Sequence, residues 1–261
     1  MDAPRGIVFD MEGVLHVGYE PLPGASAAVA ALDAAAIPHV ILTNTTSKTR
    51  ATIAARLGEM GMPYPSQRIV TAASATIAFL RRRHAGRRVL LLAEPAAFAE
   101  IATEGGIELV EDGREAEVVC LGGPDESITY AHLQEAFRAL MGGAAFVAMQ
   151  RNRWWPTPDG PGLDAGVFVK GLEYASGRRA TVIGKPAAGA YRAALAVLGV
   201  PAADAMMVGD DPVADLATAH RIGLRTCLVR TGKGATFAAP WPTADLDLPS
   251  VSALPEALGL R

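Results

Sequence analysis

The stretch VFDMEGVLHVG (residues 8–18) runs from apolar residues into Asp10, places a second acid at Glu12 and breaks at Gly13. Two carboxylates held close together repel, and each raises the pKa of the other. Such a pair is therefore costly unless a cation or a proton-transfer role maintains it. The alternative is a plain acidic turn after a strand, and the rest of the chain decides between the two.

Short runs rich in Val, Ile and Leu alternate with longer Ala-rich segments of helical character, which predicts βα units and a parallel sheet. The strands expected in this sheet are 6–10, 39–44, 181–185, 205–210 and 225–230. Four of the five end on a polar residue, namely Asp10, Thr43, Lys185 and Asp210. Ligands bind at the carboxyl ends of the strands in an open parallel sheet, so we expect these four side chains to converge.

A block between the second and third of these strands has enough apolar residues for a small core of its own. Its expected strands are 88–93, 116–123 and 144–150, and its expected helices lie near 96–104, 129–141 and 165–176. We therefore predict an α/β protein with a Rossmann-like parallel sheet, helices on both faces of the sheet, and an inserted α/β cap. The core covers 1–76 and 179–261, and the cap covers 77–178.

Composition excludes several classes of function. The 261 residues are 50% hydrophobic and 20% charged with a net charge of -3, and no long tract gathers Lys and Arg. We therefore expect neither nucleic acid nor a membrane as a partner. Cys120 and Cys227 lie far apart in apolar runs, as expected for core residues in a reducing compartment. The start of the chain lacks the apolar stretch of a signal peptide, so a cytoplasmic location is expected.

The residues at the predicted strand ends suit the chemistry of a phosphoryl group. Asp10 and Asp210 are hard oxygen ligands of the kind Mg2+ prefers, and Asp211 and Asp215 follow closely enough to support such a site. Thr43 offers a hydroxyl, and the segment after it has the form of a helix start, whose free N–H groups favour an anion. Lys185 adds a compact positive charge.

Each feature also has a plain structural interpretation. Residues 43–46 are suited to capping a helix, and Lys185 before Pro186 is suited to a strand end followed by a helix start. The segment GDDPVAD (209–215) is suited to an acidic first helical turn. Because the features recur in this order and at successive strand ends, we favour a phosphoryl-binding site.

The segments FDMEGVL, LTN, GKP and GDDPVAD resemble, in order and spacing, the four motifs of the haloacid dehalogenase (HAD) superfamily of phosphohydrolases. The cap between the second and third motifs is similar to that of the class IIA branch. The resemblance implies a Mg2+-dependent phosphatase that acts on a small phosphorylated metabolite through an aspartyl-phosphate intermediate.

The same resemblance implies a role for each matching residue. Asp10 would be the nucleophile, and Mg2+ would be held by the carboxylates of Asp10 and Asp210 and by the backbone carbonyl of Glu12. Thr43, the backbone of Asn44 and Lys185 would bind the phosphoryl group, while Asp211 and Asp215 would support the metal site. Glu12 stands where the superfamily usually has the Asp that acts as general acid and base, so slow turnover is expected.

Selectivity among substrates should lie in the cap, since the strand-end residues recognise only the phosphoryl group. The candidates are Arg151, Arg153, Trp154 and Trp155. Their alternative role is to pack the cap against the core, or against a second copy of the chain in a homodimer. A different class of function also stays open, which is a catalytically weak HAD fold that binds a phosphorylated ligand or a protein partner.

Overall fold

The computed structural model describes residues 3–18, 20–103, 106–123, 128–157, 160–236 and 244–260. Its contacts divide the chain into two compact units. The first unit contains Met1–Thr43, Arg50–Val70 and Lys185–Arg261, and the second contains Asn44–Thr49 and Thr71–Gly184.

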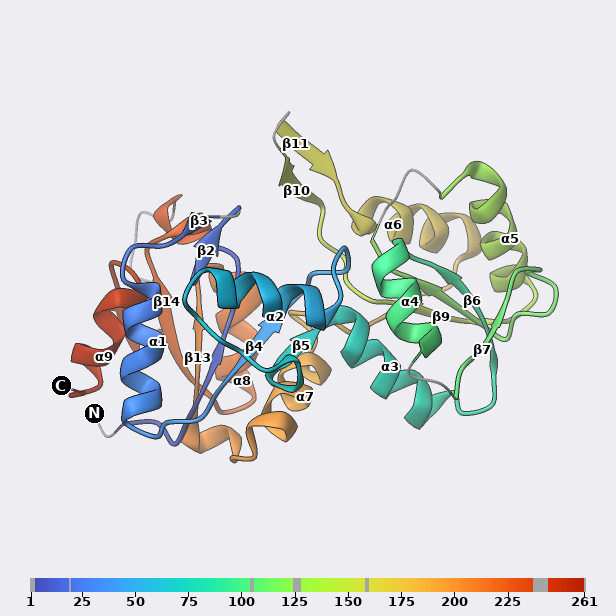
Figure 1. Ribbon diagram of the computed structural model, residues 1–261. Coiled ribbons are helices and arrows are strands. Elements are labelled where there is room, and N and C mark those ends of the chain that lie inside the picture. The colour runs from blue at the N-terminus through green and yellow to red at the C-terminus, as the bar shows by residue number, and fades with distance from the viewer. Residues whose placement is uncertain are drawn as a thin grey trace. The chain divides into compact units, whose positions relative to one another are not determined.

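The first unit is built on a sheet of six described strands in the order β15-β14-β13-β1-β4-β5 (Figure 1). These strands are β15 (Leu246–Leu248), β14 (Arg225–Val229), β13 (Ala205–Gly209), β1 (Gly6–Phe9), β4 (His39–Thr43) and β5 (Ile69–Thr71). β1 is parallel to both of its neighbours, with Phe9 paired to Val208 on one side and to Ile41 on the other. This arrangement confirms the predicted parallel α/β fold.

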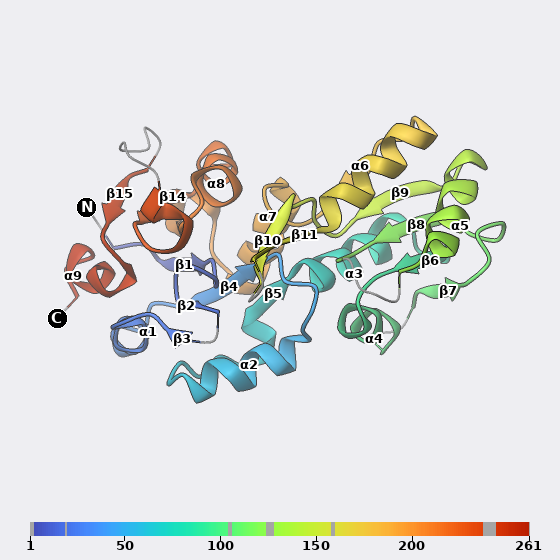
Figure 2. The same cartoon turned by 90° about the horizontal axis from the view of Figure 1, so that it is seen from above.

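Helices cover both faces of this sheet, with α1 and α2 on one side and α7 and α8 on the other in Figure 2. The helices of the unit are α1 (Ala25–Ala34), α2 (Arg50–Glu59), α7 (Ala188–Leu198), α8 (Ala217–Arg221) and α9 (Leu254–Ala257). Alternate strand residues such as Ile7 and Phe9 pack with Leu32 of α1 and Leu57 of α2 in one buried cluster. Successive side chains of a strand point to opposite faces of the sheet, so alternate residues pack against the same layer of helices. A short hairpin, β2 (His16–Val17) and β3 (Glu20–Pro21), follows β1.

The second unit has its own sheet, in the order β12-β9-β8-β6-β7, and a separate hairpin of β10 and β11. Its strands are β6 (Arg88–Leu92), β7 (Glu108–Val110), β8 (Val118–Leu121), β9 (Ala145–Ala148), β10 (Trp154–Thr157), β11 (Gly160–Leu163) and β12 (Thr181–Val182). Its helices are α3 (Ala72–Arg83), α4 (Pro95–Thr103), α5 (Tyr130–Met141) and α6 (Ala165–Ser176). Leu140 of α5 and Val169 of α6 share a buried cluster with Val119 and Phe146 of the sheet.

One predicted strand was assigned to the wrong sheet. The run 181–185 was expected beside the other catalytic strands, but β12 covers only Thr181–Val182 and pairs with β9 of the second unit. Beyond β12 the chain stays attached to the second unit, because the N–H groups of Ile183 and Gly184 donate to the carbonyls of Ala148 and Met149. With β12 in the second sheet, the units divide at 184/185, whereas 178/179 was expected. They divide at 70/71 rather than 76/77 because α3 packs against α4.

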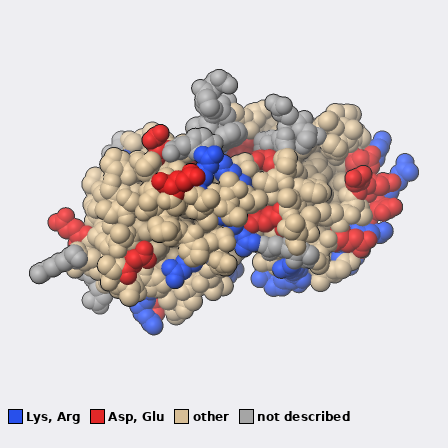
Figure 3. Space-filling view, in the orientation of Figure 1, with Lys and Arg blue, Asp and Glu red and all other residues tan. Residues whose placement is uncertain are grey.

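The surface carries charged side chains of both signs, as the composition of the chain predicts. Figure 3 shows blue side chains gathered beneath α3, whose last turn carries the exposed Arg81, Arg82 and Arg83. Cys120 and Cys227 are buried and free, as predicted for core residues. None of the helices in the described part of the chain is both long enough and apolar enough to span a membrane.

Candidate active site

Asp10 lies at the carboxyl end of the central strand. Its backbone N–H donates to the carbonyl of Val208 at 2.9 Å, so β13 holds the residue directly after the last paired position of β1. Thr43 ends β4 two residues beyond Ile41, the partner of Phe9, and is buried. Asp10, Thr43 and the residues after β13 therefore share one edge of the sheet, as the strand pattern predicted.

Lys185 enters the first unit from the second and is 4% exposed. Its Nζ lies 2.6 Å from Oδ1 of Asp10 and 2.7 Å from Oδ1 of Asp215. Burial lowers the pKa of this ammonium group, but the charges of Asp10 and Asp215 outweigh that effect and raise it above its usual value. Lys185 is therefore charged throughout the ordinary pH range and lies between two acids.

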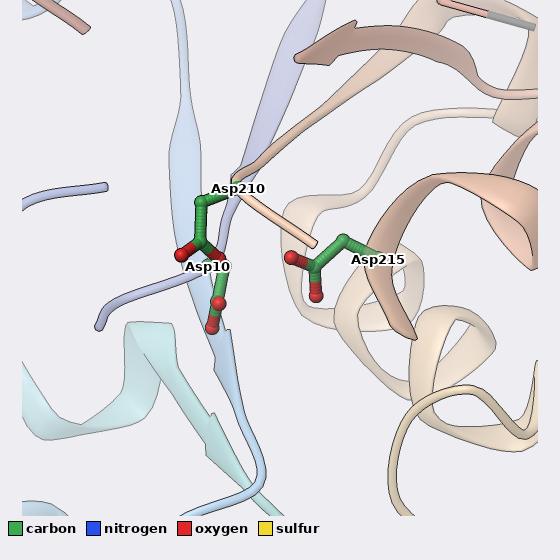
Figure 4. A group of neighbouring side chains, drawn as sticks. All are labelled: Asp10, Asp210 and Asp215. Carbon is green, nitrogen blue, oxygen red and sulfur yellow. The ribbon is translucent and has the colours of Figure 1, made fainter. Parts of the chain in front are cut away.

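Three carboxylates converge beside this lysine, from Asp10, Asp210 and Asp215 (Figure 4). Burial, followed by the charges of Asp10 and Asp215, raises the pKa of Asp210 to about 8. Burial and the charge of Asp10 raise the pKa of Asp215 to about 7. Such shifts mean that the fully ionised cluster is destabilised by its surroundings.

The geometry of this cluster fits a divalent cation. One oxygen of each carboxylate can be chosen so that the three lie within 4.8 Å of one another, and the described residues contain no other such acidic group. Carboxylate oxygens are the hard ligands that Mg2+ prefers. A cation here would offset the repulsion that raises the pKa values of Asp210 and Asp215. Asp215, expected only to support the metal site, thus lies in the cluster itself.

Two glycines leave room for the Asp210 carboxylate. A Cβ on Gly13 would lie 2.0 Å from Oδ2 of Asp210, and a Cβ on Gly232 would lie 2.2 Å from the same atom. Both residues also have a positive φ, +83° and +52°, which favours glycine. Any side chain at either position would displace a carboxylate of the cluster.

The loop after β14 also helps to fix the position of the Asp210 carboxylate. The backbone N–H of Lys233 donates to Oδ2 of Asp210 at 2.7 Å, and Thr231 Oγ1 donates to the carbonyl of Gly13 at 2.5 Å. Sequence reasoning missed this role, because the donor at position 233 is a backbone N–H and therefore leaves no side-chain signal. The glycine at position 232, shortly after an apolar run, was the one local signal.

Asp211 is not a member of the three-carboxylate cluster but organises the turn that contains Asp215. Its Oδ1 accepts from the N–H groups of Val213 and Ala214, and its Oδ2 lies 3.0 Å from Lys233 Nζ. Burial acts in the opposite direction, but these contacts lower the pKa of Asp211 below its usual value. Its own N–H donates to Oδ2 of Asp215 at 3.0 Å.

The Glu12 side chain is engaged with the hairpin that follows it. Its Oε1 accepts from the N–H of Gly18 at 2.7 Å, and its Oε2 lies 3.1 Å from Nδ1 of His16. The side chain is 47% exposed, whereas that of Asp10 is 12% exposed. The two acids of the opening motif therefore lie in different surroundings.

The remaining predicted residues belong to the second unit. Asn44 donates from Nδ2 to Oδ1 of Asn152 at 3.4 Å. Nη1 of Arg151 lies 4.0 Å from Oε1 of Glu173, beside a hollow of about 450 Å³ on α6. Arg153 and Trp154 are exposed. The side chain of Trp155 lies outside the described part of the structure.

Comparisons with known proteins agree with this architecture. A family model of haloacid dehalogenase-like hydrolases matches residues 7–108, and a model of HAD-hydrolase-like proteins matches residues 182–250. The human haloacid dehalogenase-like hydrolase domain-containing protein 2 is 32% identical over 231 residues, which are 88% of this chain and 86% of that protein. Human phospholysine phosphohistidine inorganic pyrophosphate phosphatase is 32% identical over 235 residues, 88% and 84% of the two chains. The solved p-nitrophenyl phosphatase from Archaeoglobus fulgidus superimposes with a TM-score of 0.89 at 27% identity, covering 98% of this chain and 100% of that one.

Proposed function

The chain belongs to the haloacid dehalogenase-like hydrolases, and on this premise we propose that it is a Mg2+-dependent phosphatase of small phosphorylated metabolites. The observation that supports this most directly is the contact of Lys185 with Asp10, at 2.6 Å, beside the carboxylates of Asp210 and Asp215. One buried acid thus lies next to both a fixed cation and a set of metal-binding oxygens. A nucleophile that must approach an anionic phosphoryl group needs such surroundings.

In the proposed reaction, the carboxylate of Asp10 attacks phosphorus, the bond from phosphorus to the ester oxygen breaks, and an aspartyl-phosphate forms. Lys185 and the Thr43 hydroxyl hold the phosphoryl oxygens, together with the backbone N–H of Asn44. Asp10, Asp210 and the carbonyl of Glu12, supported by Asp211 and Asp215, would hold Mg2+, which would supply positive charge to the phosphoryl group. Glu12 supplies the proton to the leaving oxygen. Its carboxylate then takes a proton from a water molecule that attacks phosphorus, and the bond from phosphorus to the Asp10 oxygen breaks, which releases phosphate and restores both acids.

The names of the relatives support the reaction class. One is a phosphatase of phospholysine, phosphohistidine and inorganic pyrophosphate, and another is a p-nitrophenyl phosphatase. All of these substrates release a phosphoryl group, while their leaving groups differ widely. We therefore assign to this chain hydrolysis of a phosphoryl group from a small molecule, with the second unit acting as a class IIA cap and choosing the leaving group.

Phosphate release from p-nitrophenyl phosphate, measured with Mg2+ and with excess chelator, tests the proposal. We expect turnover only with the metal, and no turnover by Asp10→Asn, because Asn is a poor nucleophile. Retention of more than a few per cent of the rate by Asp10→Asn would exclude the covalent mechanism.

The position of Glu12 favours one alternative. Because its carboxylate is engaged with Gly18 and lies beside His16, the second candidate function is a catalytically weak HAD fold that binds a phosphorylated ligand or a protein partner. Tight binding of inorganic phosphate without turnover of any phosphate ester would favour this second function.

A further inference from the structure

Residues 44–49 form a separate segment of the second unit, although both flanking stretches of chain belong to the first. Thr43 ends β4, and Asn44 is the next residue. The backbone N–H that the proposed function assigns to the phosphoryl group therefore begins a segment whose contacts lie in the other unit. What holds this segment determines where that N–H points.

Two side chains of the second unit bind the segment directly. Oδ1 of Asn152 accepts from Nδ2 of Asn44 at 3.4 Å, and Oε1 of Glu94 accepts from the buried hydroxyl of Thr46 at 3.2 Å. Asn152 precedes β10, and Glu94 precedes α4. Two acceptors from separate parts of the unit thus fix alternate residues of the segment.

Two glycines shape the space around these contacts. A Cβ on Gly184 would lie 2.6 Å from Oδ1 of Asn44, and a Cβ on Gly123 would lie 2.4 Å from Oγ1 of Thr46. The latter would also lie 2.0 Å from Oε1 of Glu94. Neither glycine has a positive φ, so the requirement at both positions is space. The segment therefore lies in a slot that fits it closely.

Asn152 is itself held by a buried polar network. Oε1 of Gln150 accepts from the N–H of Asn152, Nε2 of Gln150 donates to Oδ1 of Asp164, and the same Asp164 oxygen accepts from the N–H of Ala165 at 2.6 Å. Gln150 is 2% exposed and Asp164 is 7% exposed. Networks of this kind make a site rigid when every member is bonded. The acceptor offered to Asn44 is thus fixed in place.

We propose that Asn152 and Glu94 are positioning residues that hold the segment 44–49 and thereby aim the backbone N–H of Asn44 at the phosphoryl group. The inference rests on the proposed function for the role of that N–H, while the holding of the segment does not depend on it. Asn152 also lies between Arg151 and Arg153, the predicted contacts of the leaving group. Asn152 thus connects the segment proposed to bind the phosphoryl group with the stretch of chain that carries the predicted contacts of the leaving group.

The test pairs variants that remove the acceptor with variants that keep it. Asn152→Leu and Glu94→Leu remove it, whereas Asn152→Asp and Glu94→Gln keep a side-chain oxygen of the same reach. Two readouts are needed. The first is the inhibition constant of inorganic phosphate against p-nitrophenyl phosphate hydrolysis, and the second is the rate of trypsin cleavage after Lys48, followed by mass spectrometry. Tyr174→Leu, at a side chain that is 93% exposed in the same unit, is the matched control.

We expect each leucine variant to raise the inhibition constant for phosphate about three- to tenfold, the range that one typical hydrogen bond supports. The same variants should speed cleavage after Lys48, while Asn152→Asp, Glu94→Gln and Tyr174→Leu stay near the wild type. Should the leucine variants fail to fold, Asn152→Ala and Gly184→Ala take their place, the latter by displacing Asn44.

Unchanged phosphate inhibition and unchanged cleavage in the leucine variants would overturn the proposal, as would an Asn152→Asp protein that behaves like Asn152→Leu. A wild-type protein that neither turns over nor binds phosphate would instead refute the proposed function. In that case the cleavage rates alone still decide whether Asn152 and Glu94 hold the segment.

Discussion

The ammonium nitrogen of Lys185 lies 2.6 Å from Oδ1 of Asp10 and donates a second hydrogen bond, 2.7 Å long, to Oδ1 of Asp215. Asp10 follows β1, and Asp215 lies in the helical turn Pro212–Leu216 that follows β13. One buried cation thus connects the ends of two adjacent strands. Lys185 has a structural task as well as a proposed catalytic one, and the two can be separated by experiment.

Replacing Lys185 by Met should impair both tasks. Breaking a buried ion pair by removing one partner costs about 3–5 kcal/mol, so the free energy of unfolding measured at pH 8 should fall by an amount of that order. The loss of a positive group at the phosphoryl oxygens should lower kcat/KM by about 100-fold or more. Lys185→Arg, which keeps the charge, is the control and should recover most of the stability. A Lys185→Met protein with unchanged stability would contradict the paired geometry.

The origin of Lys185 also shows where sequence reasoning succeeds and where it ends. Asp10 and Asp210 were predictable because each directly follows a short apolar strand, and parallel strands bring such residues to one edge. Lys185 follows a similar run, yet β12 pairs with the second sheet. A short run of Thr, Val and Ile is apolar enough for either sheet, and pairing is decided by contacts distant in sequence. The strand pattern thus predicted Lys185 as a site residue, although it placed the preceding strand in the wrong sheet.

The support around Asp210 was beyond prediction for a different reason. Lys233 donates its backbone N–H to Asp210, and Gly13 leaves the space the carboxylate occupies. A backbone donor has no side-chain identity, so any residue type at 233 except proline supplies it. A glycine in a sequence likewise indicates conformational freedom of the backbone, but it does not show which atom of the folded chain occupies the space left by the missing Cβ. Only the folded arrangement shows that these two residues act on one carboxylate.

Gly13→Ala should weaken metal binding more than folding. Its Cβ would lie 2.0 Å from Oδ2 of Asp210, so the carboxylate must move. Forcing an L-residue into the left-handed region itself costs about 1–2 kcal/mol. Gly86→Ala is a matched control, since Gly86 has a φ of +69° and nothing within 4 Å of its added Cβ. We expect both variants to lose similar stability, and only Gly13→Ala to need a higher Mg2+ concentration for half-maximal hydrolysis of p-nitrophenyl phosphate. Superimposable metal titrations would show that Asp210 is not a ligand.

Stability should depend on pH and Mg2+ together. The pKa values of Asp210 and Asp215 are raised to about 8 and about 7 in the folded chain, whereas an unfolded Asp has a pKa of about 3.9. At these two sites the folded state therefore binds more protons between these values, so their contribution to the free energy of unfolding of the metal-free protein falls as the pH rises from about 4 to about 8.

Bound Mg2+ offsets this loss because it stabilises the ionised carboxylates. With Mg2+ at about 100 times its dissociation constant, we expect the melting temperature at pH 8 to rise by about 5–10 °C. The rise should be much smaller at pH 5.5, where protons compete with the metal. Asp210→Asn should flatten the pH dependence of the metal-free protein. An equal effect of Mg2+ at both pH values would mean that the metal does not bind these acids.

Substrate selectivity should respond to Arg151 and Arg153. Replacing both by Ala should change kcat/KM among phosphorylated metabolites several-fold more than it changes hydrolysis of p-nitrophenyl phosphate, because the small aryl ester makes few contacts beyond its phosphoryl group. Arg178→Ala, at an exposed arginine of the same unit, is the control. Since Arg151 lies 4.0 Å from Glu173, a structural role for it predicts equal losses on every substrate. A panel of phosphate esters distinguishes the two roles.

Glu12→Asp tests the acid and base of the reaction. The glutamate carboxylate lies 2.7 Å from the N–H of Gly18 and 3.1 Å from His16. An Asp side chain is shorter than a Glu side chain by one C–C bond, roughly 1.5 Å. Its carboxylate therefore cannot keep these contacts and stays nearer the backbone at position 12. A displacement on the order of 1 Å can change a rate about 100-fold. We therefore expect Glu12→Asp to hydrolyse alkyl phosphates faster than the parent and to shorten the life of the aspartyl-phosphate, measured by trapping the phosphorylated enzyme.

Glu12→Gln, which keeps the length but cannot transfer the proton, should lose more activity on alkyl esters than on aryl esters, whose leaving groups need little protonation. If Glu12→Asp is slower on every ester, the site is built around glutamate, and its contacts with the hairpin hold a working acid and base.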